Sequence, residues 1–166
     1  KLASTNIKLP YVFVADDAFP LMENLMKPYS NRNLTNEERI YNYRVSRCRR
    51  TIENAFGILA SRFRILLNQI NLRPEKAVII VLACCYLHNF LRHNKVESYY
   101  QGGVDVENIT TGEFINADWR ADPTLLTLHP VQGRNSTITA KNIRTQLCNY
   151  FNTVGSVPWQ NTILYQ

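Results

Sequence analysis

The chain is poor in cysteine and lacks both a long apolar run and an apolar N-terminal segment. Its 4 cysteines include no Cys-x-x-Cys pair, which argues against a disulfide scaffold or a cysteine zinc site and indicates reduced thiols. Residues 1–10 are too polar for a signal peptide. The longest apolar run, Ala77–Leu87, is far shorter than the about 20 residues of a membrane span. We therefore expect a soluble intracellular protein with no membrane partner.

What the chain has is an ordinary apolar content and a mild excess of basic residues. Hydrophobic residues make up 45% of its 166 residues, which excludes wholesale disorder and collagen-like classes and suits one domain. The 19 Lys and Arg residues against 13 Asp and Glu residues give a net charge of +6. This balance favours a polyanionic partner such as DNA without proving one.

Two aspartates follow the first apolar segment. Tyr11 to Ala15 is a β-branched and aromatic run that predicts a buried strand, and Asp16-Asp17 comes directly after it. Carboxylates at the end of a strand often form metal or catalytic sites, but aspartate is also a favoured turn residue, so a plain turn remains an alternative. The next segment, Leu21–Lys27, predicts a short helix that stops before Pro28.

The clearest element is a long helix that begins with a capping box. Thr35-Asn-Glu-Glu38 has the required pattern, and apolar residues then recur with helical spacing, which predicts one helix or two collinear helices over 36–67. Gly57 inside this helix indicates either a close packing point or a break.

This helix is unusually rich in arginine. Its basic residues are all arginines: Arg39, Arg44, Arg47, Arg49, Arg50, Arg62 and Arg64. Between Arg39 and Arg64, Glu53 is the one acidic residue. Arginine suits bidentate phosphate contact, so the pattern favours phosphate binding. The alternative is a solvated face on which Arg49 and Glu53 form an ion pair.

The second half of the chain predicts two further helices around a polar loop. Pro74 starts a helix whose residues 77–91 are apolar on nearly all sides and therefore require cover. Cys84 and His88 share a face there, but two ligands do not make a metal site. Residues 94–135 read as a polar loop. A last helix is capped by Thr137 or Thr139 and is followed by a tail whose Trp159 docks on the body.

Several ordered motifs resemble the nuclease domain of PIF/Harbinger transposases. They are Val14-Ala-Asp-Asp-Ala-Phe-Pro-Leu21, Asn24-Leu-Met-Lys-Pro-Tyr29, Leu34-Thr-Asn-Glu-Glu-Arg-Ile-Tyr-Asn-Tyr-Arg-Val-Ser-Arg47, Ile52-Glu-Asn-Ala-Phe-Gly-Ile-Leu59, Arg62-Phe-Arg-Ile-Leu66, Cys84-Cys-Tyr-Leu-His-Asn-Phe-Leu91 and Gly155-Ser-Val-Pro-Trp-Gln160. The resemblance implies an α/β, ribonuclease-H-like (DDE) nuclease fold, here its mostly helical C-terminal portion with one or few strands. The expected organisation is a core over 1–95, a polar loop or insertion over 96–135, and a C-terminal helix and tail over 136–166.

The resemblance also implies the site residues. Asp16 takes the place of the second catalytic carboxylate, although Ala15 replaces the family's glycine, and Asp17 is the second choice as a metal ligand. Glu53 takes the place of the third carboxylate, 37 residues after Asp16. The implied cofactor is Mg²⁺ or Mn²⁺ in a two-metal site. The implied DNA contacts are Arg47, Arg49, Arg50 and Arg44.

One ligand of the implied triad has no counterpart here. Residues 1–15 contain no Asp or Glu, so the first aspartate is missing, and we expect an incomplete nuclease domain that is inactive alone. The two-metal site is expected only where an upstream aspartate is supplied, and the apolar helix at 77–91 is expected to lack part of its cover. The alternative function is a domesticated, catalytically inactive DNA- or protein-binding module. The implied partners are DNA and a separate Myb-like DNA-binding protein, in the nucleus, the cytoplasm or both.

Overall fold

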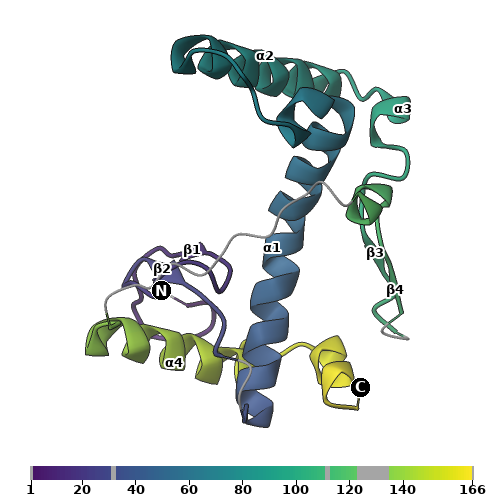
Figure 1. Cartoon of the computed structure of the whole chain (residues 1–166). Coiled ribbons are helices and arrows are strands. Elements are labelled where there is room, and N and C mark those ends of the chain that lie inside the picture. Colours follow the sequence, from purple (N-terminus) through teal and green to yellow (C-terminus); the bar gives the residue numbers. More distant parts are fainter. Residues whose placement is uncertain (1, 31–32, 111–112, 123–134, 166) are drawn as a thin grey trace. The chain divides into compact units, whose positions relative to one another are not determined.

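A computed structural model describes residues 2–30, 33–110, 113–122 and 135–165 of the chain (Figure 1). The chain divides into two compact units. The first contains the described parts of Lys1–Arg50, Ile109–Gly112 and Leu128–Gln166, and the second those of Thr51–Asn108 and Glu113–Thr127. Helix α1 (Asn36–Arg62) contributes residues to both. The described residues are mostly helical with a few short strands, which is compatible with the expected α/β class.

The first unit packs a small parallel sheet and two helices around one core. Strand β1 (Phe13–Val14) pairs in parallel with β2 (Leu25–Met26). Helix α4 (Ile138–Asn152) lies beside this sheet in Figure 1, and the 3₁₀ helix η3 (Pro158–Tyr165) follows it. The buried core comprises Leu21, Met26, Tyr41, Val45, Ala140, Ile143, Leu147 and Cys148.

The N-terminal strand is shorter and more exposed than its sequence predicts. Of the expected Tyr11–Ala15 strand only Phe13 and Val14 pair with β2, and Tyr11 and Phe13 are 103% and 75% exposed. The prediction of a buried strand is therefore wrong. Among the described residues, the sheet that these residues form has two strands.

The helix predicted over Leu21–Lys27 is also wrong, because this segment turns and forms β2. Met22 and Leu25 exchange backbone hydrogen bonds of 3.0 and 3.2 Å, which close a tight turn. The chain then pairs with β1, and the Ala15 amide donates to the Met26 carbonyl at 2.8 Å. Pairing with a strand distant in sequence overrides the helical spacing of this short segment.

The predicted cap at Thr35 is confirmed, and of the two candidates for the last helix the cap is Thr137 and not Thr139. The Glu38 amide donates to Thr35 Oγ1 at 3.3 Å, and the Thr35 amide donates to Glu38 Oε2 at 3.1 Å, as a capping box requires. The Ala140 amide donates to Thr137 Oγ1 at 3.1 Å. Helix α1 ends at Arg62, and a 3₁₀ helix, η1 (Arg64–Leu67), completes the predicted 36–67 segment.

The second unit is built on the C-terminal part of α1. Helix α2 (Pro74–His93) is followed by α3 (Glu97–Tyr100), and β3 (Val106–Glu107) pairs antiparallel with β4 (Phe114–Ile115). A 3₁₀ helix, η2 (Asp118–Ala121), then packs Trp119 directly against Gly57 of α1. Gly57 is therefore a close packing point, one of the two alternatives that its position predicts.

Helix α2 is largely exposed within the described part of the chain. Only Cys84 and His88 among its described side chains are buried. Its exposed apolar residues include Val78, Ile79, Val81, Leu82, Tyr86, Leu87 and Phe90. By length and composition alone this helix could also cross a membrane, a test that core helices of soluble proteins pass as well. The cover on all sides that its apolar surface requires is not provided by the residues described.

Candidate active site

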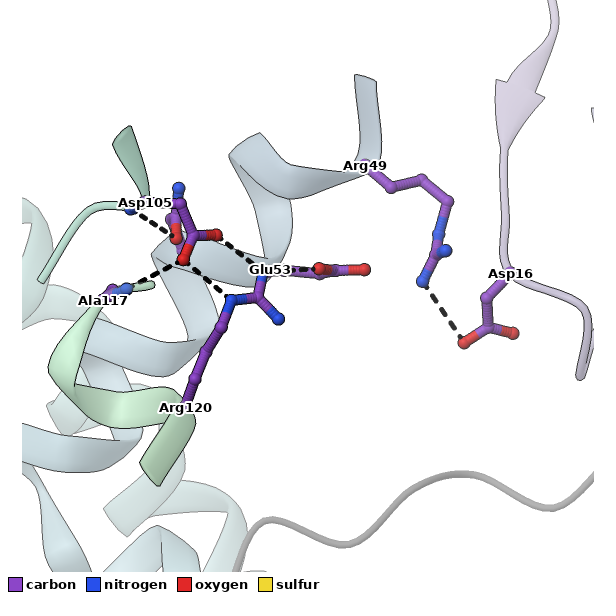
Figure 2. Close-up of polar contacts among 7 residues, drawn as sticks. Asp16, Arg49, Glu53, Asp105, Ala117 and Arg120 are labelled. Carbon is purple, nitrogen blue, oxygen red and sulfur yellow. Dashed lines mark hydrogen bonds and ion pairs between the residues drawn. The ribbon is translucent and has the colours of Figure 1, made fainter. Parts of the chain in front are cut away.

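Asp16 forms the predicted turn after β1 and faces an arginine of α1. Its Oδ1 accepts a hydrogen bond of 2.9 Å from the Ala18 amide, which is the turn that aspartate commonly makes. Its Oδ2 lies 3.5 Å from Arg49 Nη2, as Figure 2 shows, and the two side chains are 31% and 20% exposed. The carboxylate at the strand end is therefore both a turn residue and the partner of a cation.

Asp17 has a different partner. Its Oδ1 lies 3.0 Å from Lys27 Nζ, and the same ammonium donates to the Asp17 carbonyl at 2.8 Å. The Asp17 side chain is 66% exposed, about twice the exposure of Asp16. Adjacent carboxylates thus pair with separate cations.

Glu53 lies on α1 in the second unit, where a distant arginine holds its carboxylate. Arg120 Nη2 donates to Glu53 Oε2 at 2.9 Å, and the Glu53 side chain is 29% exposed. Arg120 belongs to η2, 67 residues further along the chain. The sequence alternative pairs Glu53 with Arg49 on the same helix, whereas the structure pairs it with Arg120, which the spacing along α1 could not identify.

A buried aspartate anchors Arg120. Asp105 is 1% exposed and accepts hydrogen bonds from Arg120 Nε at 2.7 Å and Arg120 Nη2 at 2.6 Å. The Ala117 amide donates to the same carboxylate at 2.9 Å (Figure 2). The hydrogen bonds to Asp105, and secondarily that to Glu53, raise the pKa of Arg120. Neither Asp105 nor Arg120 was predicted as a site residue, because both lie in a stretch without periodicity.

The two predicted DNA-binding residues Arg44 and Arg47 contact the tail of the chain. Arg44 Nη1 donates to the Gln160 side chain at 2.8 Å and to the Gly155 carbonyl at 3.2 Å. The Arg44 and Arg47 guanidinium groups lie 5.4 and 4.1 Å from the Trp159 ring centroid. Burial lowers the pKa of Arg44. The docking of Trp159 is confirmed, and Arg44 contributes to it.

The described residues do not by themselves fit a metal site. Asp16 and Glu53 belong to different units, and each carboxylate has an arginine partner. Among the residues that the structure describes, no group of three or more His, Cys, Asp or Glu side chains could hold an ion. The carboxylate oxygens of Asp16 and Glu53 are suitable ligands for Mg²⁺. Two carboxylates that each have an arginine partner are, however, too few to hold two ions.

Helix α1 carries Arg44, Arg47, Arg49 and Arg50, and arginine can hold a phosphate group through two hydrogen bonds. The family model of the DDE superfamily endonucleases matches residues 2–89, more than half of the chain. The chain therefore belongs to this family, whose members generally use divalent metal ions and act on DNA. Neither the curated proteins nor the solved structures provide a match.

Proposed function

We propose that the chain serves DNA cleavage or transposition of the PIF/Harbinger type, with a ribonuclease-H-like fold and with Asp16 and Glu53 as its catalytic carboxylates. The observation that carries this proposal is the extent of the endonuclease match, which includes both carboxylates and the arginine-rich helix α1. Carboxylates in such sites hold the ions or protons that phosphodiester hydrolysis requires. Divalent ions supply that chemistry in the family, and a further ligand is needed here beside Asp16 and Glu53.

The test is nicking of supercoiled plasmid in Mg²⁺ or Mn²⁺ by the full chain joined to an upstream segment that supplies the further aspartate ligand. We expect Glu53→Gln and Asp16→Asn each to lower the rate by about 100-fold or more, the scale of losing a group that acts in the transition state. Glu75→Gln is the matched control, because Glu75 is an exposed carboxylate in the first turn of α2. Equal nicking by the unmodified chain and by Glu53→Gln would show that the assignment of Glu53 is wrong.

A binding module without cleavage is the second candidate function, and one observation favours it. Both candidate carboxylates already have an arginine partner, Arg49 for Asp16 and Arg120 for Glu53. Such pairs need no metal ion. This function predicts that the unmodified chain binds DNA with an affinity that falls steeply with salt but does not nick it. A Myb-like partner and a nuclear location stay predictions of the resemblance.

A further inference from the structure

A cation from outside the matched family region reaches Glu53. The endonuclease match ends at residue 89, whereas Arg120 lies in η2. Arg120 Nη2 is shared between two carboxylates, Glu53 Oε2 at 2.9 Å and Asp105 Oδ2 at 2.6 Å. The contact with Glu53 is therefore part of a three-residue network rather than an isolated surface pair.

The Arg120 guanidinium is held by contacts with Asp105 and Trp119 in addition to its contact with Glu53. Asp105 receives both Arg120 Nε and Nη2, a fork that only a planar guanidinium can make. The Arg120 guanidinium also lies over the Trp119 ring, 4.3 Å from its centroid. With its position set in this way, the arginine presents Nη2 to Glu53 in one direction.

The anchor is tied to the helix that carries Glu53. The Asp105 amide donates to the Asn54 side chain at 3.3 Å, and Asn54 is the neighbour of Glu53 on α1. Asp105 is 1% exposed, so its charge depends on the arginine, whereas Glu53 is 29% exposed and remains accessible. Of the two carboxylates that share this cation, Glu53 is the accessible one.

We propose that Arg120 is a positioning residue for Glu53, with Asp105 as the anchor that holds Arg120. Asp105 and Arg120 then belong to the endonuclease site. This inference rests on the proposed function only in that Glu53 takes part in cleavage. The contact itself can be tested without activity.

The first arm of the experiment measures the contact by NMR on the full chain. The Arg120 Nε–H signal, assigned by its loss in Arg120→Lys, is expected to exchange slowly with solvent. Asp105→Asn should remove this protection, whereas Glu53→Gln should preserve it, because Nε donates to Asp105. The Glu53 side-chain carboxyl signal should shift in Arg120→Gln and in Arg120→Lys. An unshifted Glu53 signal in both variants would overturn the proposal.

The second arm measures plasmid cleavage by the full chain joined to the upstream segment that supplies the further aspartate ligand. We expect Arg120→Gln to lower kcat by about 10- to 100-fold, the scale found for residues that orient a catalytic group, with little change in KM for DNA. Arg120→Lys should restore part of the rate because it keeps the charge without the fork. Asp122→Asn is the matched control: it alters another Arg–Asp pair in the same unit, Arg64–Asp122 at 3.4 Å, whose two residues are not members of the Asp105–Arg120–Glu53 network.

The two arms separate the failure of this inference from that of the proposed function. If Glu53→Gln abolishes cleavage while Arg120→Gln cleaves at the normal rate, Arg120 does not position Glu53. If Glu53→Gln cleaves normally, Glu53 is not a catalytic residue. The NMR arm then still decides whether Arg120 contacts the Glu53 carboxylate. Should Arg120→Gln not fold, Arg120→Lys carries both measurements.

Discussion

Gly57 is the position on α1 where η2 packs closely against the helix. A Cβ atom at this position would clash with the ring of Trp119, the neighbour of Arg120. We expect Gly57→Ala to lower the free energy of unfolding by about 1–3 kcal/mol, the usual effect of overpacking. Alanine in an open helix position would instead stabilise the chain by about 1 kcal/mol. Urea denaturation measures the difference and its sign.

Ser46→Ala is the control for this substitution, because Ser46 is an exposed position of the same helix. It tests helix propensity alone and should leave the chain as stable or slightly more stable. A stabilising Gly57→Ala would show that Trp119 does not pack against α1.

His88 gives the second unit an acid-sensitive contact. Its Nδ1 lies 2.6 Å from the Tyr99 hydroxyl, and burial, with a smaller effect of Arg92, lowers the pKa of His88. The folded ring is therefore neutral where the unfolded ring, with its ordinary pKa of 6.5, already takes up a proton. Below pH 6.5 the unfolded chain binds more protons at His88 than the folded chain does. The contribution of His88 to the free energy of unfolding should therefore be constant above this pH and fall below it.

Denaturation of the full chain between pH 5 and pH 8 tests this slope. His88→Gln should flatten the loss of stability on the acid side, whereas His93→Gln, at an exposed position near the end of α2, should keep it. Identical acid-side slopes for the unmodified chain and His88→Gln would exclude His88 as the group responsible.

Among the elements, α1 depends on its first turn. The capping box between Thr35 and Glu38 satisfies backbone amides that have no carbonyl partner within the helix. Thr35→Ala should therefore lower the free energy of unfolding by about 1 kcal/mol, and Thr35→Ser should retain most of the stability. Thermal denaturation compares the two, and equal melting temperatures for Thr35→Ala and the unmodified chain would argue against the cap.

The elements that the sequence predicts correctly are those with local signals. The caps at Thr35 and Thr137 and the proline that starts α2 lie within one turn of the helices that they begin. Strand β2 carries no such signal, because it forms by pairing with β1 across an intervening turn. Asp105 and Arg120 escape prediction for the same reason: their roles come from contacts with residues far away in sequence.

At the scale of the whole molecule, the sequence predicts the protein family better than it predicts which residues form one site. The prediction of a DDE endonuclease is confirmed by the match over residues 2–89. The joint role of Asp16 and Glu53 stays a prediction, since spacing cannot place two residues that belong to different units. The number of arginines in α1 likewise does not tell which of them bind DNA and which hold the tail of the chain. Arg44 holds the tail, because it donates to Gln160.

The net charge of +6 makes a last prediction, that DNA binding weakens as salt rises. If Arg50 contacts a phosphate, Arg50→Gln should reduce the slope of log K against log salt by about 1. Arg44→Gln should mainly lower the melting temperature, because its guanidinium bonds the tail through Gly155 and Gln160. Fluorescence anisotropy with a short duplex at several salt concentrations measures the slopes.

The control for this measurement must remove the same charge from another place. Lys8→Gln does so at an exposed position in the N-terminal segment, outside α1. If binding depends on the arginines of α1, Lys8→Gln leaves the slope nearly unchanged while Arg50→Gln lowers it. Equal effects of the two variants would mean that the net charge of the molecule, and not the arginine-rich helix, attracts DNA, and the helix would then have no special part in binding.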